Sequence, residues 1–298
     1  MVNFPIDYIE PVFRPPSEAR SLILPVTNGC SWNQCTFCEM YTQPQKKFRA
    51  RKETDISNDI QNAARQLGEV RRVFLADGDA MVLPTRRLLA ILQELKQAFP
   101  ELQRVSSYCL PRNLARKTVE ELAQLREAGL AFLYVGMESG DDEVLKRINK
   151  GESYASTRSA LDKIRRAGLT SSVMVLNGLG GESLSRQHAI NTATLCNETQ
   201  PDYLSTLVVS FPQGEQRFRK GFGTDFVPLD QAGLFAEIKL FLEHLELSNT
   251  VFRSDHASNY LVLKGRLGRD KERLLAEVEL ALTNPGAAAL RPEWLRGL

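Results

Sequence analysis

Three cysteines lie close together near the start of the chain, at Cys30, Cys35 and Cys38, in a CxxxxCxxC pattern. Thiolates are soft ligands that select iron–sulfur clusters or zinc. A structural zinc site takes four ligands, usually from two close pairs, and no fourth cysteine or histidine follows nearby. Three ligands leave one iron of a cubane cluster open. The pattern therefore favours an open iron–sulfur cluster over two alternatives, a zinc site completed by a distant residue and plain buried cysteines.

Composition narrows the class of protein. The chain has 298 residues, of which 43% are hydrophobic and 25% charged, as in ordinary globular proteins. The formal net charge is +2, which gives no reason to expect nucleic acid or an anionic membrane as a bulk partner. Residues 1–16 lack the features of a signal peptide, and no apolar run is long enough to span a membrane. We expect a cytoplasmic protein with reduced cysteines, in which Cys109 and Cys196 are buried thiols.

Apolar runs alternate with amphipathic segments, a pattern that predicts a parallel sheet built from βα units. The expected strands lie near 21–27, 72–76, 104–109, 131–137, 171–177 and 203–210, with helices over 54–67, 118–128 and 153–167. The predicted class is α/β, a partial (β/α)6 TIM-like barrel with a C-terminal α-rich extension. Its parts are an N-terminal extension over 1–19, the barrel over 20–212 and a capping extension over 213–298. In the extension we expect a loop over 211–227, helices near 229–246 and 269–283, and an irregular stretch over 247–268.

Chemistry in such folds gathers where parallel strands end. The second strand is followed by Asp77, Gly78 and Asp79, the fourth by Glu138 and Ser139, and the fifth ends in a glycine-rich loop at Gly178. Carboxylates accept hydrogen bonds from an ammonium group or from hydroxyls. Glycines let a chain approach a flat ring closely. The plainer interpretations are a polar turn that caps a helix and the charged, solvated start of a helix.

Taken in this order, the motifs resemble those of the radical S-adenosylmethionine (radical SAM) superfamily over roughly residues 20–212. The spacing has one residue more than the usual CxxxCxxC, and the stretch GMESGDDEVLKRINKG is closest to relatives of oxygen-independent coproporphyrinogen oxidase and to cobalamin-linked radical enzymes. The resemblance implies a 4Fe–4S cluster on the three cysteines. It also assigns cofactor-binding roles: an adenine contact to Phe37, the amino group to Asp79 or Asp77 beside Gly78, the ribose to Glu138 and Ser139, the carboxylate to Lys150 or Arg147, and adenine again to Val175 and Gly178.

The implied activity is reductive cleavage of S-adenosylmethionine to a 5′-deoxyadenosyl radical, which abstracts hydrogen from an unidentified substrate. A low-potential donor such as flavodoxin or ferredoxin is then required. The basic run Lys46, Lys47, Arg49, Arg51 and Lys52 could receive an acidic donor or an anionic substrate, or could simply be solvated.

The region after the barrel contains a polar and aromatic segment from which we take Arg253, Asp255, His256 and Asn259 as candidate catalytic residues at the substrate. A structural cap is an equal alternative, and His188 and His244 are expected to be structural. Two other functions stay open: a non-catalytic iron–sulfur or haem carrier related to coproporphyrinogen oxidase, and a tRNA- or protein-modifying member of the same superfamily. The near-neutral charge argues mildly against RNA.

Overall fold

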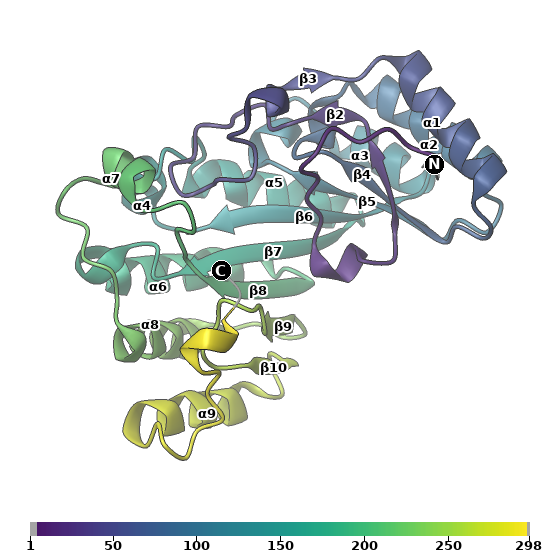
Figure 1. The fold of residues 1–298 in the computed structure, drawn as a ribbon. Helices are drawn as coiled ribbons and strands as arrows, with labels where there is room; N and C mark the ends of the chain where they lie inside the picture. The colour runs from purple at the N-terminus through teal and green to yellow at the C-terminus, as the bar shows by residue number, and fades with distance from the viewer. Residues whose placement is uncertain (1–4, 297–298) are drawn as a thin grey trace. The chain divides into compact units, whose positions relative to one another are not determined.

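The computed structural model describes residues 5–296, so the first four residues of the expected N-terminal extension and the last two of the C-terminal one lie outside it. The chain divides into two compact units. Figure 1 labels the helices and strands of both. The first unit comprises residues up to Asn33, Cys38–Val135 and Asp162–Ser171. The second unit comprises Gln34–Phe37, Gly136–Leu161 and residues from Ser172 onward.

The first unit is built on parallel strands in the spatial order β1, β4, β5 and β6. Their bounds are Leu22–Pro25, Arg72–Ala76, Arg104–Cys109 and Leu130–Glu138, the last of which ends in the second unit. A separate antiparallel pair, β2 (Thr27–Asn28) and β3 (Arg49–Ala50), flanks the cysteine loop. Continuous apolar runs such as RVFLA in β4 are buried almost throughout, as expected of parallel strands covered on both faces.

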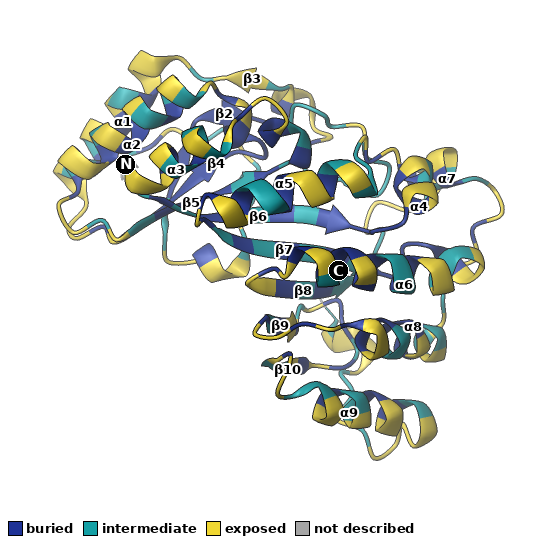
Figure 2. Cartoon of the chain, turned by 180° about the vertical axis from the view of Figure 1, so that it is seen from behind, coloured by how far each residue is buried: buried dark blue, intermediate teal, exposed yellow. Residues whose placement is uncertain are grey.

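Three helices connect these strands: α1 (Glu53–Gln66), α2 (Thr85–Ala98) and α3 (Val119–Glu127). The start of α3 is the expected capping box, because Thr118 accepts the backbone N–H of Glu121 and the Glu121 carboxylate accepts that of Thr118. Each helix buries one side and exposes the other, as the two-coloured ribbons of Figure 2 show. Short 3-10 turns cover Pro16–Glu18, Pro44–Lys46, Ala80–Val82 and Pro111–Leu114.

The second unit also alternates strands with helices. Its strands β7 (Thr170–Asn177) and β8 (Tyr203–Val208) are parallel to each other, and β7 begins in the first unit. Their helices are α4 (Asp142–Arg147), α5 (Tyr154–Arg166), whose last residues belong to the first unit, and α6 (Gly181–Thr199). Beyond β8 lie α7 (Gln216–Phe222), α8 (Gln231–His244), α9 (Lys271–Thr283) and the turn Glu293–Leu295. Cys109 and Cys196 are buried, as expected.

Two expectations for the C-terminal region were wrong. The segment 211–227 is not all loop: it contains α7, because Phe218 and Phe222 lie one helical turn apart and pack with Phe226 in an apolar core. The stretch 247–268 is not irregular: β9 (Val251–Ser254) extends the parallel set beside β8, and β10 (Leu263–Arg266) pairs antiparallel with β9. Four-residue strands carry little pattern of their own, so only pairing reveals them.

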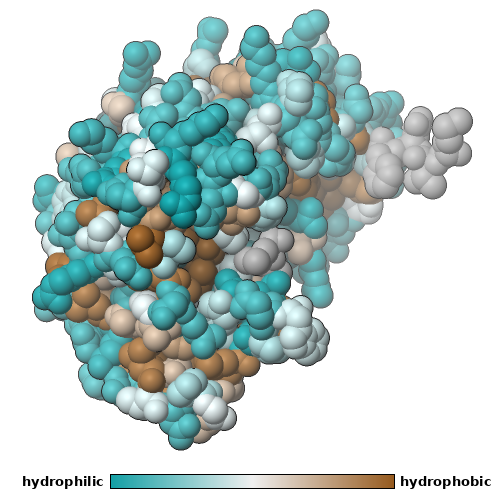
Figure 3. Space-filling view, turned by 60° about the vertical axis from the view of Figure 1, so that its left-hand side comes forward, coloured by the Kyte–Doolittle hydropathy of each residue, from teal (hydrophilic) through white to brown (hydrophobic). Residues whose placement is uncertain are grey.

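Most of the surface visible in Figure 3 is hydrophilic, with hydrophobic residues in smaller patches and hollows. None of the helices within residues 5–296 combines the length and the apolar content needed to cross a bilayer.

Candidate functional site

The cysteine loop is shared between the units. Cys30 and Cys38 belong to the first unit and Cys35 to the second, and all three are half-buried thiols outside any disulfide. The backbone on either side of Cys35 is fixed within the second unit, since Thr36 N–H donates to Ile148 O at 2.9 Å and Asn149 donates to Gln34 O. Within residues 5–296, no three His, Cys, Asp or Glu side chains are grouped closely enough to form a metal-ion site. Assignment of the thiols to one cluster therefore stays a prediction.

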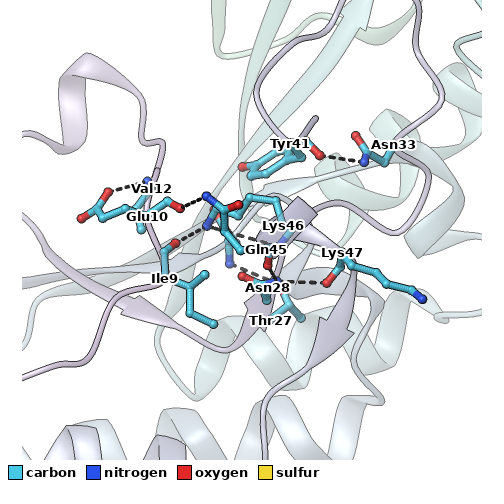
Figure 4. A network of polar contacts seen from close by, with 12 residues as sticks. Ile9, Glu10, Val12, Thr27, Asn28, Asn33, Tyr41, Gln45, Lys46 and Lys47 are labelled. Carbon is cyan, nitrogen blue, oxygen red and sulfur yellow. Dashed lines mark hydrogen bonds and ion pairs between the residues drawn. The ribbon is translucent and has the colours of Figure 1, made fainter. Parts of the chain in front are cut away.

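Directly before Cys30, the loop depends on a glycine and a buried lysine. Gly29 has φ +70°, and a Cβ there would stand 2.0 Å from the carbonyl oxygen of Lys46. Lys46 is 1% exposed; its Nζ lies 2.5 Å from both Ile9 O and Asp77 Oδ2. Asn28 ties the same turn by donating to the carbonyls of Gln45 and Lys47, as Figure 4 shows. Glycine is needed here because another side chain would collide with the backbone.

The turn after β4 holds two buried carboxylates in different environments. Asp77 is ion-paired with Lys46, whereas Asp79 accepts a long 3.3 Å bond from Ser31 N–H at its Oδ2. Oδ1 of Asp79 is buried and makes no hydrogen bond to any residue in the described range 5–296. Burial raises the pKa of Asp79, and the hydrogen bonds from Ser31 partly oppose that effect. Oδ1 of Asp77 is likewise buried without a hydrogen-bond partner in that range, so the two carboxylates differ in the ion pair to Lys46, which only Asp77 makes.

Gly78 lies between these carboxylates, and a Cβ there would stand 2.4 Å from the ring of Tyr41. The Tyr41 ring is buried, and its pKa is raised by burial first and by Asp77 and the thiols of Cys38 and Cys30 next. The turn, the aromatic ring and the two outer cysteines are therefore close together in the first unit.

A second buried ion pair lies at the end of β6. Lys150 Nζ donates to Glu138 Oε1 at 2.9 Å, and both side chains are about 5% exposed. Oε2 of Glu138 is buried without a hydrogen-bond partner in the described part of the chain. Glu138 adopts φ +62°, a left-handed conformation that costs a non-glycine residue energy and that clusters at functional sites. Gly136 makes the pair possible, since a Cβ there would stand 2.2 Å from Glu138 Oε1.

The remaining predicted cofactor residues also lie in the second unit. Phe37 packs against the core around α4 and α7, and the Lys150 ammonium lies 5.6 Å from its ring centroid. Ser139 is fully buried, and Val175 is buried within β7. Gly178 has φ +83° just beyond β7, which favours glycine.

The four C-terminal candidates differ in how far they are already engaged. Asn259 is buried and accepts Val208 N–H while donating to Thr206 O, so it joins its loop to β8. Asp255 pairs with Lys264, and His256 contacts Ser258. The Arg253 side chain is exposed. A small cavity of about 20 Å³ beside Asn259 has room for roughly one water molecule.

The basic run after the cysteines is not a continuous solvated patch. Lys46 forms a buried ion pair with Asp77, and Arg51 forms an ion pair with Asp59 at 2.5 Å. Lys47, Arg49 and Lys52 remain exposed.

Sequence reasoning missed several residues that support these sites: Gly29, Tyr41, Lys46 and Gly136. The only available signal was indirect: Gly29 directly precedes the first cysteine, and Gly136 stands two residues before Glu138. Lys46 was hidden in a run of surface-type residues, and burial of its ammonium group is decided by Asp77, 31 residues away.

The structure thus combines a mostly parallel α/β fold with a cysteine triplet on the loop after its first strand and with buried carboxylates at later strand ends. The chain belongs to the radical SAM superfamily, whose family model matches residues 24–193, more than half of its length. Proteins of this family bind a 4Fe–4S cluster and S-adenosylmethionine, and these are the expected cofactors.

Among curated proteins, the chain is 22% identical over 166 residues to the heme chaperone HemW of Bacillus subtilis, across 53% of this chain and 43% of the relative. It is 23% identical to a tRNA-2-methylthio-N(6)-dimethylallyladenosine synthase of Saccharophagus degradans, across 61% and 41%. The chain thus spans about two-fifths of the curated relatives it matches.

Solved structures share the fold at low identity. Coproporphyrinogen III oxidase (HemN) from Escherichia coli superposes with a TM-score of 0.55 and 18% identity, across 75% of this chain and 52% of that one. Methylornithine synthase (PylB) superposes with a TM-score of 0.51 and 15% identity, across 91% and 74%. The expected α/β fold class is confirmed.

Proposed function

We propose that this chain is a radical SAM enzyme that cleaves S-adenosylmethionine reductively and acts on a substrate not yet identified. The observation that carries the proposal is that a chain with a cysteine triplet also has buried carboxylates at two strand ends, Asp77 and Asp79 after β4 and Glu138 at the end of β6, each with one oxygen unpartnered among residues 5–296. Buried polar atoms are almost always hydrogen-bonded, so such oxygens point to a missing ligand.

The residues present fit the cofactors. Cys30, Cys35 and Cys38 form no disulfide and carry thiols, the donor type that iron–sulfur clusters take, and each is partly accessible. A 4Fe–4S cluster held by these three cysteines would supply the low-potential electron that reductive cleavage of S-adenosylmethionine requires.

In the first unit, Asp79 accepts the ammonium group of S-adenosylmethionine with its open Oδ1, while Asp77 stays paired with Lys46. Gly78 lets the turn lie directly against the ring of Tyr41. The chain's own contribution here is a negatively charged acceptor that is fixed before binding, so little ordering remains to be done.

In the second unit, Glu138 accepts the ribose hydroxyls with Oε2, while Lys150 holds Oε1 and is available to a carboxylate. Arg147, the alternative considered for the carboxylate, is committed to Glu143 and Asp225. Ser139, the next residue in the chain, is assigned to the ribose together with Glu138, and Phe37, Val175 and Gly178 are assigned to adenine.

The reaction needs a low-potential electron donor, for which flavodoxin or ferredoxin is proposed. The exposed Lys47, Arg49 and Lys52 are the part of the basic run that remains available to such an acidic protein. We place the protein in the cytoplasm. Arg253, Asp255, His256 and Asn259 are proposed to shape the substrate site, with exposed Arg253 as the direct contact and Asn259 as the residue that holds the segment to β8.

Anaerobic reconstitution tests the proposal. We expect about four irons per chain, and 5′-deoxyadenosine after reduction with S-adenosylmethionine present. Cys35→Ala should lose the cluster, whereas the matched control Cys109→Ala, a buried thiol in β5, should keep it. Asp79→Asn should keep the cluster and weaken S-adenosylmethionine binding about tenfold, the cost of one charge-assisted hydrogen bond. Stoichiometric zinc without iron would overturn the proposal.

A second candidate is a haem carrier that holds a cluster without turnover, favoured by the similarity to HemW. A reconstituted protein that binds haem and forms no 5′-deoxyadenosine would support it. A modified tRNA base missing from a deletion strain would instead support a tRNA-modifying enzyme, to which the similarity to the methylthio synthase points.

A further inference from the structure

A buried polar network in the second unit joins two of the segments assigned to the cofactor. Its centre is His188 on α6, which is 2% exposed. The Nε2 atom of His188 lies 3.0 Å from the carbonyl oxygen of Leu176, and its Nδ1 lies 2.8 Å from the Ser139 hydroxyl. A carbonyl oxygen can only accept, so the hydrogen must be on Nε2. In the neutral ring Nδ1 then accepts from Ser139, whose oxygen also accepts Asp141 N–H.

Glu237, on α8, completes the network from the other side of the same histidine. It is 3% exposed, and its Oε1 accepts Gly178 N–H at 2.6 Å while its Oε2 accepts the Ser185 hydroxyl at 2.6 Å. Its Oε1 is 3.9 Å from His188 Nε2. Burial raises the pKa of Glu237, and His188 and the two hydrogen bonds oppose that effect. Burying a carboxylate costs free energy unless its oxygens accept hydrogen bonds, and both oxygens of Glu237 do so.

The same helix also supports the chain around Gly178 by packing and by a second hydrogen bond. Asn177 donates to Leu234 O, and a Cβ at Gly178 would stand 2.8 Å from the Leu234 side chain. Helices α6 and α8 pack against each other along this region. The left-handed turn at Gly178 is therefore held by α8, an element that follows the matched family domain at residue 193.

We propose that Glu237 and His188 are positioning residues: together they fix the ends of β6 and β7 relative to each other, so that Glu138 and Gly178 are preorganised for S-adenosylmethionine. The inference rests on the proposed function and deepens it. It makes the C-terminal extension part of the cofactor site, through a carboxylate that touches only protein. Because Glu138 and Gly178 are already ordered, binding of S-adenosylmethionine costs less conformational entropy. Loss of the positioning contacts should therefore weaken the affinity for S-adenosylmethionine.

The test compares variants of the reconstituted full chain. Glu237→Ala should raise the Kd for S-adenosylmethionine about tenfold at unchanged iron content, the equivalent of one buried hydrogen bond. Glu237→Gln keeps an acceptor for Gly178 and should stay within about threefold of wild type. Glu243→Ala, at an exposed position on the same helix, is the matched control and should leave Kd unchanged. In Glu237→Ala, KM for S-adenosylmethionine should increase, while kcat at saturating S-adenosylmethionine should stay unchanged.

Should Glu237→Ala fail to fold, His188→Gln and His188→Asn separate the two histidine bonds, since each amide can replace only one ring nitrogen. Both should then weaken binding several-fold. A Kd within twofold of wild type in folded Glu237→Ala, or in both histidine variants, overturns the inference even if their melting temperatures fall. Wild-type protein that carries the cluster and does not bind S-adenosylmethionine overturns the proposed function itself, and the two failures are told apart by that measurement.

Discussion

Among residues 5–296, each unit contains a buried lysine–carboxylate pair, and the two pairs have different surroundings. Lys46–Asp77 in the first unit and Lys150–Glu138 in the second are both almost fully buried. The second contact of Lys46 is a backbone carbonyl, that of Ile9. The second contact of Lys150 is the face of the Phe37 ring. Glu138 adopts a left-handed backbone, whereas Asp77 does not.

The comparison indicates that the same type of ion pair has a structural role in the first unit and a ligand-binding role in the second. Lys46 joins the N-terminal segment to the cysteine loop and the β4 turn, so the first pair holds the backbone of three segments together. The second pair is confined by Gly136, is strained at Glu138 and has a side chain from the cysteine loop as its third member. Strain that persists at such a site is typical of preorganised binding residues.

Breaking the first pair should have the largest effect on stability. Lys46→Met leaves the Asp77 carboxylate buried without its cation, and the expected loss is about 3–5 kcal/mol of unfolding free energy. Urea unfolding of the metal-free protein measures it. Lys47→Met, at an exposed neighbouring position, is the control and should be within about 0.5 kcal/mol of wild type. Asp77→Asn in the Lys46→Met background should recover much of the loss, and a loss below about 1 kcal/mol would show that the pair is not structural.

Crowding the second pair should have a smaller effect on stability and a visible one on binding. Gly136→Ala places a methyl group 2.2 Å from Glu138 Oε1, so the carboxylate must move. The expected cost is about 1–3 kcal/mol, with weaker S-adenosylmethionine binding measured by equilibrium titration. Gly68→Ala is the control, because a Cβ there meets nothing within 4 Å. Unchanged affinity in folded Gly136→Ala would separate the pair from the cofactor.

The smallest effect concerns the pH dependence of stability at Asp79. Here the substitution is expected to raise the free energy of unfolding, whereas the two substitutions above lower it. Burial raises the pKa of this carboxyl above its usual 3.8 in the folded protein, so the folded state holds the proton more tightly than the unfolded chain. Stability is therefore lost as pH rises from 3.8 through the raised pKa. Asp79→Asn should be more stable than wild type at pH 7, and the gap should narrow toward pH 4. Denaturant unfolding at both pH values measures it, and a gap that widens on acidification would refute the assignment.

Much of the fold could be predicted because its signals are local. The six apolar runs became β1, β4, β5, β6, β7 and β8, and the helices between them follow the expected periodicity. Residues that a short segment places by itself, such as the Thr118–Glu121 capping box, were also predictable. The strands β9 and β10 and the helix α7 were not, since each is stabilised by partners distant in the chain.

The sequence by itself determined the superfamily motifs. The spacing of the cysteines and the order of the acidic residues after the strands are fixed by the covalent chain. Only the tertiary structure decided which of these groups are already engaged. It pairs Asp77 with Lys46, leaves one oxygen each of Asp77, Asp79 and Glu138 without a hydrogen-bond partner among residues 5–296, and brings Glu237 to the turn at Gly178 from 59 residues away. The physical reason is that burial and ion pairing depend on which segments meet in space, and the energy of a buried charge is set by those neighbours.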